Sequence, residues 1–538
     1  MLSLLMARRS SPRFGGSSRL VTVFLASSRF SLQVAALSTS GVIFSLKDPT
    51  LLPRNDDVPC FDVFNPAATQ AAFDDGSAII AKVQNMQCDD ARKAIEKASS
   101  VFPSWRDGTT AHERSAILSR WSYLIKENTD DIATIMTLES GKPIQESQGE
   151  VAYGASFLDY YAAEAIRPTS AGGGFLTPTP FTTAEGGPRG KVIAVQEAVG
   201  VTALITPWNF PIAMITRKVG PALATGCTAL VKPSELTPLT AIALKTLADR
   251  AGVPDGVFDL ITCDSDATPD VGKEMCSNIL VKKISFTGST RVGKQLMKLG
   301  SDTVKRLSLE LGGNAPFIVF EDADINQAVN AAMASKFRNA GQTCVCADRF
   351  LIHASVEEEF LLKLKEKVNQ LSVNPGIDKG TTMGPLISSS AVLNVQKKVS
   401  EALDDGAECI AGGSPLEHLG PHFFEPTILR NVSLESRIWN SETFGPVAAI
   451  RTFETEEEAI QVANDSSTGL AAYFCSKDLA RVFRVAGKLE NGLVGVNDGI
   501  ISTASAPFGG VKESGFGREG SQLGIAEYLN TKYIFLNV

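Results

Sequence analysis

Two cysteines stand one residue apart in the segment RNAGQTCVCADRF, which runs from Arg338 to Phe350. Cysteines at this spacing can bind a metal, form a disulfide, fill a core or supply a nucleophile. A predicted helix and a glycine-containing turn precede Cys344, so its thiol can project into a cleft. The function of the chain depends on which of these roles Cys344 and Cys346 have.

A metal site around this pair is the least favoured of these roles. Two thiolates with no histidine or third cysteine within a few residues make a poor zinc site. His418 and His422 stand in the Gly/Pro segment EHLGPH, which we interpret as a surface loop. The nine cysteines are odd in number and irregular in spacing, which indicates reduced thiols in an intracellular compartment. We therefore expect no metal.

A cysteine nucleophile needs a stabiliser for the oxyanion and often a base. Asn209 in PWNFP offers an amide donor where a predicted strand opens into a loop. Glu310 ends the apolar segment RLSLE, and burial there would raise its pKa towards the range of a general base. Taken one at a time, these residues could equally be a turn asparagine, a capping glutamate and a buried cysteine.

Alternating strands and helices must position these residues. Helical patterns run from about Asp89, and a Pro/Gly/Thr-rich stretch from Pro168 to Gly190 predicts a loop or a projecting hairpin. The segments VGVTALIT, TALVK, GVFDLIT, KKISF, RLSLE and APFIVF then read as strands with helices between them. This pattern predicts an α/β fold with a parallel sheet, which binds ligands at the carboxyl ends of its strands. The residues that follow these strands are Asn209, Lys232, Glu235, Ser289 and Glu310.

FTGSTRVG has the pattern of a nucleotide site. Gly288 permits a tight turn and Ser289 or Thr290 can cap a helix, whose amino end would suit a pyrophosphate, although an ordinary N-cap has the same pattern. Lys232 and Glu235 in VKPSE end a neighbouring predicted strand. An acidic side chain there can bind ribose hydroxyls and would repel the 2′-phosphate of NADP, which favours NAD.

GFGREG, from Gly515 to Gly520, matches G-x-G-x-x-G by its letters alone. No predicted strand leads into it, and too little chain follows for a βαβ unit. We interpret it as a glycine-rich turn.

Composition narrows the class of protein. The chain has 538 residues, a net charge of −8 and 44% hydrophobic residues. This argues against nucleic acid or an anionic membrane surface as a partner and favours a small-molecule ligand. The first 47 residues are rich in Arg and Ser and lack Asp and Glu, which predicts a transit peptide for the mitochondrial matrix, before a plastid or the cytoplasm. A disordered tail is the alternative.

Seven segments resemble the NAD(P)-dependent aldehyde dehydrogenase superfamily: PWNFP, VKPSE, FTGST, LELGGNAPFIVF, GQTC, ETFGPV and PFGGVKESGFGREG. Within it, TPWNFPIAMITRKVGPAL, KFRNAGQTCVC and EYL resemble the succinate-semialdehyde dehydrogenases. The resemblance implies the oxidation of succinate semialdehyde to succinate in the degradation of GABA. A different semialdehyde, such as glutarate semialdehyde, or a general aldehyde is the nearest alternative. A non-catalytic NAD-binding structural protein is the alternative of another class.

The resemblance also implies roles for single residues. Cys344 is the nucleophile, Glu310 the general base, and Asn209 with the backbone N–H of Cys344 the oxyanion hole. For the cofactor, Lys232 and Glu235 hold the adenosine ribose. The other implied cofactor contacts are Gly288 and Ser289 at the pyrophosphate, Glu442 at the nicotinamide ribose, Phe444 beside the ring and Trp208 in the cleft.

Arg217, Arg338 and Ser502 match the positions that bind the substrate carboxylate in the resembled group. The small residues of IISTASA leave open whether longer aldehydes also enter. CVC belongs to the resemblance as well, and we hypothesise that Cys344 and Cys346 form a reversible disulfide that stops activity. Because a disulfide tightly restricts the distance and direction between its two cysteines, the loop would have to bend.

By the same resemblance the chain divides into a transit segment, residues 1–47, and three further parts. Residues 48–177 and 201–312 form a Rossmann-type NAD-binding domain, residues 313–520 a catalytic α/β domain, and residues 178–200 and 521–538 a β arm for oligomerisation. The apolar terminal strand could extend a partner's sheet, so a homotetramer or homodimer is expected.

Overall fold

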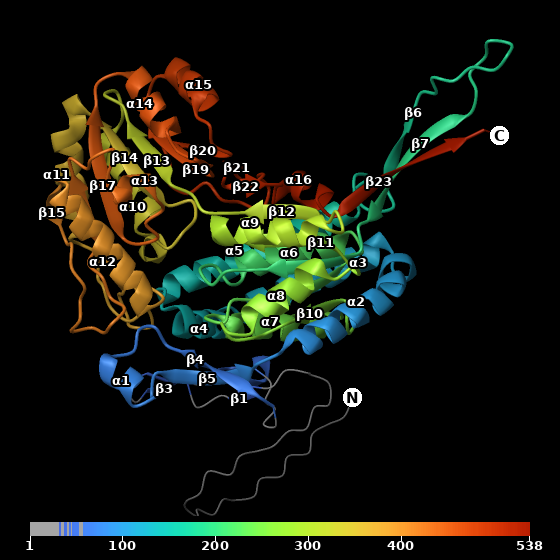
Figure 1. Ribbon diagram of the computed structural model, residues 1–538, viewed down its shortest axis with the longest axis horizontal. Helices are drawn as coiled ribbons and strands as arrows, with labels where there is room; N and C mark the ends of the chain where they lie inside the picture. Colours follow the sequence, from blue (N-terminus) through green and yellow to red (C-terminus); the bar gives the residue numbers. More distant parts are fainter. Residues whose placement is uncertain (1–31, 34–36, 40–41, 45, 53–57, 538) are drawn as a thin grey trace, which may run out of the picture.

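The computed structural model describes residues 32–33, 37–39, 42–44, 46–52 and 58–537. Most of the predicted transit segment, residues 1–47, therefore lies outside the described residues. Two large sheets flanked by helices form the body, and a narrow arm projects from one end of it (Figure 1). None of the helices within the described ranges is long and apolar enough to cross a membrane.

The first sheet has six strands in the order β10-β9-β8-β11-β12-β22. Its parallel strands are β8 (Val201–Ile205), β9 (Thr228–Lys232), β10 (Phe258–Leu260), β11 (Val281–Thr287) and β12 (Arg306–Glu310). The short β22 (Gly515–Phe516) pairs antiparallel with β12. Near-continuous apolar runs such as TALVK form these strands because both faces of the sheet are covered. The predicted parallel sheet is confirmed.

Helices cover both faces of this sheet. One layer contains α3 (Ala111–Glu127), α4 (Thr129–Ser140), α5 (Ile144–Ala165), α6 (Ala213–Ala224) and α7 (Pro238–Ala251). The other contains α2 (Cys88–Gly108), α8 (Thr268–Ser277) and α9 (Thr290–Ser301). A small hairpin of β4 (Cys60–Phe64) and β5 (Ile79–Gln84) lies below them in Figure 1.

The second sheet has seven strands in the order β15-β16-β17-β14-β13-β19-β20. They are β13 (Ala315–Val319), β14 (Ala347–His353), β15 (Glu408–Ala411), β16 (Thr427–Arg430), β17 (Val447–Phe453), β19 (Ala471–Cys475) and β20 (Leu493–Val496). Every pair is parallel except β15 with β16. The flanking helices are α10 (Ile325–Lys336), α11 (Glu357–Val368), α12 (Ser389–Asp404), α14 (Glu456–Asn464) and α15 (Leu479–Lys488).

The chain passes from the first sheet to the second between β12 and β13. It returns near its end through β22 and α16 (Ser521–Ala526), so residues distant in sequence meet where the two sheets face each other. Glu310 closes β12 at this junction, and Cys344 lies between α10 and β14 on the opposite side of it.

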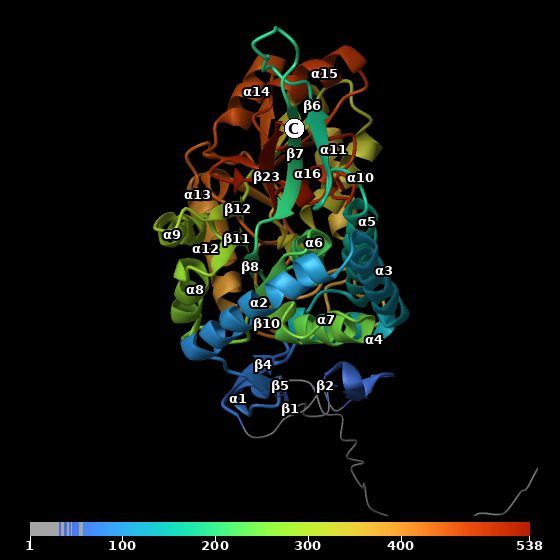
Figure 2. The same ribbon diagram turned by 90° about the vertical axis from the view of Figure 1, so that its right-hand side faces the viewer.

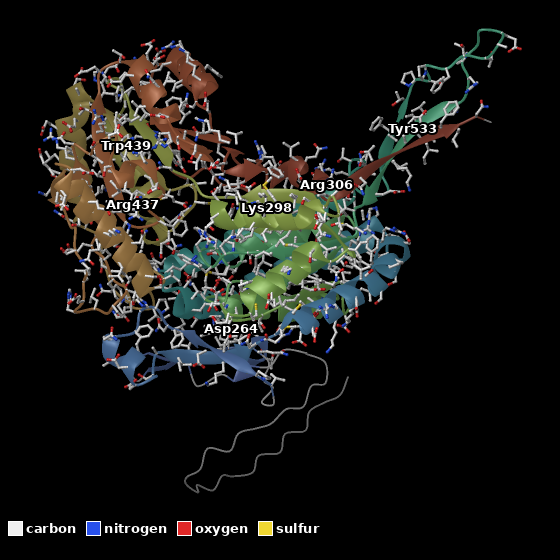
Figure 3. The ribbon with its side chains drawn as sticks, viewed as in Figure 1. Asp264, Lys298, Arg306, Arg437, Trp439 and Tyr533 are labelled. Carbon is white, nitrogen blue, oxygen red and sulfur yellow. The ribbon has the colours of Figure 1, made fainter. Side chains whose placement is uncertain are left out.

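Three antiparallel strands build the arm: β6 (Gly174–Thr177), β7 (Lys191–Ala198) and β23 (Leu529–Leu536). The predicted hairpin and the predicted terminal strand both belong to it. The arm extends well beyond the body in Figure 1 and lies in front of the body in Figure 2. Phe175, Leu176 and Tyr533 are exposed on it, and Figure 3 labels Tyr533. The arm sheet begins at Gly174, inside the range 48–177, and β22 joins the first sheet from inside 313–520, so sheets and sequence-based domain ranges do not coincide there.

Candidate active site

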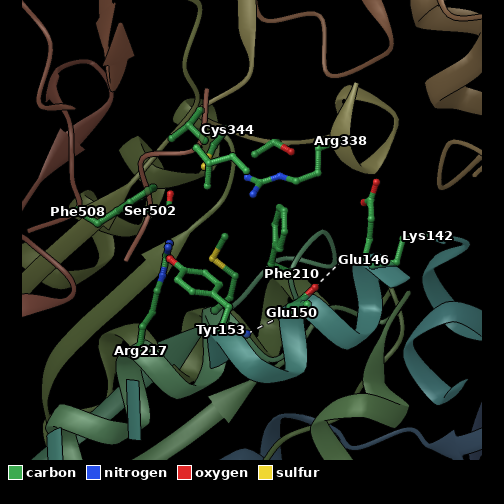
Figure 4. A pocket seen from close by; sticks show the side chains of 16 residues that line it. Lys142, Glu146, Glu150, Tyr153, Phe210, Arg217, Arg338, Cys344, Ser502 and Phe508 are labelled. Atoms are coloured by element: carbon green, nitrogen blue, oxygen red, sulfur yellow. Dashed lines mark hydrogen bonds and ion pairs between the residues drawn. The ribbon is translucent and has the colours of Figure 1, made fainter. Parts of the chain in front are cut away.

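A cavity of about 320 Å³ opens beside Cys344, at the junction of the two sheets. Helices α5 and α6, the PWNFP loop, the segment before β14 and residues 500–508 supply its walls (Figure 4). The lining side chains relevant below are Lys142, Glu146, Glu150, Tyr153, Phe210, Arg217, Arg338, Cys344, Ser502 and Phe508. The structure thus brings Cys344, Arg217, Arg338 and Ser502 to one cavity.

Glycines allow the backbone around Cys344 to pack closely against its neighbours. Gly341 has a φ of 75°, and a Cβ there would lie 2.1 Å from a backbone carbonyl oxygen. A Cβ on Gly313 would lie 2.4 Å from the carbonyl oxygen of Cys344. A larger residue at position 313 would collide with the backbone of Cys344, and one at position 341 with that of Gly445, so both positions require glycine.

Burial raises the pKa of the Cys344 thiol to about 12, and the positive charge of Arg217 opposes this rise. Negative charges on Glu442 and Glu310 act in the same direction as burial. A thiol in this environment is protonated at neutral pH. Its attack on a substrate therefore requires a base that accepts the proton as the new bond forms.

Asn209 joins the PWNFP loop to the nucleophile segment. Its side-chain Nδ2 donates a hydrogen bond to the carbonyl oxygen of Gln342 at 3.1 Å. An amide carries two N–H donors, so one remains to meet an oxyanion beside Cys344. Asn209 is buried, and its Oδ1 has no hydrogen-bond partner among the described residues.

Glu310 presents an unpartnered carboxyl group at the end of β12. Both of its oxygens are buried without a hydrogen-bond partner in the described part of the chain. Burial raises its pKa well above the usual value, and the negative charge of Glu519 raises it further. A Cβ on Gly509 would lie 2.8 Å from Glu310 Oε1, so that glycine leaves space for the carboxyl. A carboxyl with a raised pKa and free oxygens can act as a general base.

Glu519 is a site residue that the sequence analysis missed. It stands in GFGREG, the segment with the letters of a dinucleotide motif, and its carboxylate forms buried ion pairs with Arg217 and Lys218. Lys218 Nζ also donates to Thr287 Oγ1 at 2.7 Å, and Thr287 is the β11 partner of Glu310. An acidic residue in a glycine turn without a phosphate role was the only signal in the sequence.

Arg217, predicted as a substrate contact, therefore already has an anionic partner. Its guanidinium lies 4.6 Å from the centroid of the Phe508 ring, and Nη2 is buried with no hydrogen-bond partner among the described residues. The Glu519 carboxylate holds its pKa above the usual value despite burial. Nη2 remains available to a ligand in the cavity.

Arg338 enters the cavity from the opposite wall (Figure 4). Its guanidinium lies 5.4 Å from the centroid of the Phe210 ring, and its buried Nε has no hydrogen-bond partner in the described residues. Ser502 lies beside Tyr153, whose phenol it contacts by a hydrogen bond. Burial raises the pKa of Tyr153, so this hydroxyl stays a donor. Two cations and two hydroxyls can thus meet one carboxylate.

On the other side of Cys344, the first sheet provides a site that fits a dinucleotide. Its strand order reverses at β8, the topological switch point at which parallel sheets bind nucleotides. Thr206 at this edge has a buried hydroxyl without a partner among the described residues. Lys232 Nζ lies 3.9 Å from Glu235 Oε2, so a cation and an acid stand together where a ribose would bind.

The amino end of α9 faces the same edge. The exposed Ser289 caps this helix by accepting a hydrogen bond from the Val292 N–H at 3.4 Å. The Gly288 N–H donates to the Glu310 carbonyl at 3.1 Å, and a Cβ on Gly288 would lie 2.4 Å from the Phe286 ring. The turn is compact, and the helix end offers N–H groups to an anion.

Glu442, Phe444 and Trp208 are the remaining residues that the sequence assigned to the cofactor. Glu442 accepts a hydrogen bond from the Gly313 N–H at 3.3 Å, and burial raises its pKa to about 8. The Trp208 and Phe444 rings meet edge to face with centroids 5.6 Å apart. These side chains form an apolar wall with one carboxyl, which suits a nicotinamide and its ribose.

Cys346 points away from this arrangement. It is buried, its Sγ donates to the carbonyl oxygen of Lys336 at 3.4 Å, and burial raises its pKa to about 12. Cys344 and Cys346 are both free thiols. Across the described ranges, no group of three or more His, Cys, Asp and Glu side chains could hold a metal ion.

The chain belongs to the aldehyde dehydrogenase family, whose model matches residues 55–534. This is the fold and the set of motifs that the sequence had indicated. The junction cavity, with Cys344 between a dinucleotide edge and an apolar pocket, is therefore the candidate active site of an aldehyde-oxidising enzyme.

Individual relatives are similar over nearly the whole chain. Succinate-semialdehyde dehydrogenase 1 of Schizosaccharomyces pombe, named for NADP(+), is 48% identical over 89% of this chain and 92% of its own. A mitochondrial succinate-semialdehyde dehydrogenase of Mus musculus is 48% identical over 88% of this chain and 87% of its own. A glutarate-semialdehyde dehydrogenase of Pseudomonas aeruginosa is 49% identical over 85% of this chain and 92% of its own.

A solved structure agrees with this comparison. The crystal structure of succinate-semialdehyde dehydrogenase from Burkholderia pseudomallei superposes with a TM-score of 0.86. It is 47% identical in sequence and covers 92% of this chain and 100% of its own.

Proposed function

We propose that this enzyme oxidises succinate semialdehyde to succinate with NAD as the hydride acceptor. The observation that carries the proposal is one cavity in which Cys344 meets two arginines, Arg217 and Arg338, that each keep an unpartnered N–H within the described part of the chain. The names of the yeast, mouse and Burkholderia relatives support the substrate. Succinate semialdehyde has a carboxylate at one end and an aldehyde at the other, which matches cations at the walls and a thiol between them.

Binding places the two ends of the substrate. The carboxylate accepts hydrogen bonds from Arg217 and Arg338, with the hydroxyls of Ser502 and Tyr153 beside them. Its charge enters a site that already contains Glu519, so Arg217, Arg338 and Lys218 together offset two anions. The aldehyde carbon then lies at the Cys344 sulfur, and its oxygen faces the Asn209 amide and the backbone N–H of Cys344.

The chemistry proceeds through a covalent bond to Cys344. The thiol loses its proton to the Glu310 carboxylate while sulfur attacks the carbonyl carbon, giving a thiohemiacetal whose oxyanion the Asn209 amide stabilises. Glu442, Phe444 and Trp208 would hold a nicotinamide, which would supply the hydride acceptor for that carbon, and loss of the hydride would leave a thioester on Cys344. Glu310 releases the thiol proton to solvent and then removes a proton from water as the water attacks the thioester. The C–S bond breaks, Glu310 returns that proton to the Cys344 sulfur, and succinate leaves.

Glu235 supports NAD as the cofactor. Its carboxylate stands beside Lys232 at the ribose position and would repel a 2′-phosphate. Lys232 could instead attract that phosphate, and the yeast relative is named for NADP(+). We propose that the acid dominates, and the ratio of kcat/KM for NAD and NADP tests this.

Glutarate semialdehyde is the second candidate substrate, since the Pseudomonas relative carries that name. Absorbance at 340 nm with succinate semialdehyde, glutarate semialdehyde and butanal separates the possibilities. The proposal predicts the highest kcat/KM for succinate semialdehyde. A preference for glutarate semialdehyde would make that aldehyde the proposed substrate. A preference for butanal would contradict the binding of a substrate carboxylate by Arg217 and Arg338. No NADH with any aldehyde would favour a non-catalytic NAD-binding protein.

Three further properties belong to the proposal. The N-terminal composition and the name of the mouse relative support import into the mitochondrial matrix, which a fluorescent fusion in cells tests. The exposed apolar side chains of the arm support a homotetramer or homodimer, which light scattering tests. A reversible Cys344–Cys346 disulfide requires that peroxide inactivation of Cys346→Ala lose its reversal by dithiol.

A further inference from the structure

A buried ion pair lies behind the loop that carries Asn209. Lys142 precedes α5 and Glu150 lies within it, and their side chains are 1% and 2% exposed. Figure 4 shows both beside the cavity, on the wall formed by α5. The mechanism above uses neither charge. Since a buried ion pair often contributes no more stability than apolar residues of the same volume, stability alone does not explain it.

Both members of the pair hold the backbone of the PWNFP segment. Lys142 Nζ donates to the carbonyl oxygen of Asn209 at 2.7 Å. Glu150 Oε1 accepts from the backbone N–H of Ile212 at 2.9 Å and of Ala213 at 3.4 Å. The N-cap residue of α6, Ile212, provides no side-chain cap, so Glu150 supplies the missing acceptor. The pair therefore fixes residues 209–213 at both ends.

A second contact from α5 fixes the nucleophile segment. Glu146 Oε2 accepts from the Asn339 N–H at 2.8 Å. Asn339 Nδ2 in turn donates to the Asn209 carbonyl at 3.2 Å and to the Gln342 carbonyl at 3.3 Å. The Asn209 carbonyl thus receives donors from both Lys142 and Asn339, while its own amide donates to Gln342. The start of α5 and Lys142 before it therefore fix the position of the Asn209 loop relative to the segment that carries Cys344.

We propose that Lys142, held by Glu150, is a positioning residue that sets the orientation of the Asn209 amide toward the oxyanion. The inference rests on the proposed role of Asn209 but not on the identity of the aldehyde or the cofactor. A preorganised donor must stay within about 0.5 Å of its productive position. A misplacement of about 1 Å can lower the rate roughly a hundredfold. Loss of the Lys142 bond would leave the Asn209 carbonyl with one donor and allow such a shift.

A cofactor-free reaction tests the proposal independently of the dehydrogenase activity. Hydrolysis of p-nitrophenyl acetate transfers the acetyl group to Cys344, releases p-nitrophenolate and then consumes water, so it needs no dinucleotide. The variants are Lys142→Met/Glu150→Gln, which removes both charges and leaves no unpaired ion, Asn209→Ala, and their combination. Failure of the dehydrogenase proposal appears as absent NADH in the wild type, whereas failure of this inference appears within the ester cycle.

We expect the paired variant to hydrolyse the ester about ten- to a hundredfold more slowly than the wild type, the order that misplacement produces. In the Asn209→Ala background the same pair of changes should cost less than about twofold, because interacting residues are not additive. Full multiplication of the two losses, or a wild-type rate in the paired variant, overturns the proposal. Lys142→Arg, which keeps a donor and a charge, should retain more of the rate than Lys142→Met.

Two controls separate positioning from a general loss of structure. Lys245→Met removes a buried lysine that pairs with Asp249 on α7 and lines no part of the cavity, so it should leave ester hydrolysis unchanged. Hydrogen exchange of the peptide containing residues 207–213 reads the backbone directly. It should accelerate in the paired variant and not in Lys245→Met, and unchanged protection in the paired variant contradicts the inference even if activity falls.

Discussion

The two sides of Cys344 are built in opposite ways. On the substrate side, Arg217, Lys218 and Glu519 are almost fully buried, and each charge has a partner before any ligand binds. On the cofactor side, Ser289 is exposed, and Glu235 keeps a third of its side chain in contact with solvent at 3.9 Å from Lys232. A large dinucleotide can bring its own charges to a helix end and a strand edge. A small aldehyde makes few contacts, so its binding depends on charged side chains that are already held in place.

This difference predicts different costs for mutation. Removing one member of a buried ion pair leaves an unpaired charge and typically costs about 3–5 kcal/mol of stability. Removing an exposed or weakly paired charge typically costs about 0–1 kcal/mol. Variants of Arg217, Lys218 or Glu519 should therefore change both stability and activity, whereas variants of Glu235 should change only cofactor preference.

The largest effect is expected at the nucleophile between the two sides. Cys344→Ala removes the proposed nucleophile, so aldehyde oxidation should fall by on the order of 10⁴-fold or more. Cofactor binding, measured by calorimetry, should be unchanged because the dinucleotide edge is separate. Cys409→Ala, which changes an exposed cysteine, is the matched control and should be fully active. Substantial NADH formation by Cys344→Ala would contradict the mechanism.

Glu519→Gln should lower the stability of the protein and should shift the pH dependence of catalysis. Arg217 and Lys218 lose their shared carboxylate, so urea unfolding should reveal a loss of about 3–5 kcal/mol. The folded-state pKa of Glu519 lies below its usual value, so its contribution is present above about pH 4.5 and is lost as pH falls through the folded value.

The same variant should also move the pH profile of catalysis. Because the charge of Glu519 raises the pKa of Glu310, its removal should lower that pKa. The acid limb of kcat should then shift to lower pH. An unchanged acid limb would show that the base is not Glu310, or that the two carboxyls do not interact.

Arg338→Ala and Arg217→Ala should have different effects, because only Arg217 also forms an ion pair with Glu519. Arg338 has no carboxylate bound to it among the described residues, so its loss should raise KM for succinate semialdehyde about tenfold or more and leave butanal nearly unaffected. Arg217 also balances Glu519, so its loss should reduce kcat for both aldehydes. Equal effects of both variants on both substrates would contradict this division of roles.

The smallest change in stability is expected on the cofactor side. Glu235→Gln should change the free energy of unfolding by less than about 0.5 kcal/mol, as is usual for surface positions. The ratio of kcat/KM for NADP to that for NAD should nevertheless rise about tenfold, because the repulsion of a 2′-phosphate is removed. A ratio that does not move would assign cofactor choice to other residues.

The local sequence pattern was sufficient to predict the strands of the first sheet and the candidate site residues at their carboxyl ends. The apolar runs and the turn residues predicted the parallel strands β8 to β13, and Asn209, Lys232, Ser289 and Glu310 were placed at the strand ends because that is where parallel sheets bind ligands. The glycine-containing turn before Cys344 likewise indicated that its thiol can project into a cleft. Specific roles came from resemblance to a family, which spacing alone could not replace.

Sequence alone determined which groups could react, because side-chain chemistry and strand periodicity are local properties. Only the tertiary structure decided their charge states and their neighbours. Glu519 and Lys218 are 301 positions apart in the chain, and no local pattern connects them. Their buried ion pair forms only because β22 and α16 fold back against the first sheet and α6, where burial makes each charge require a partner.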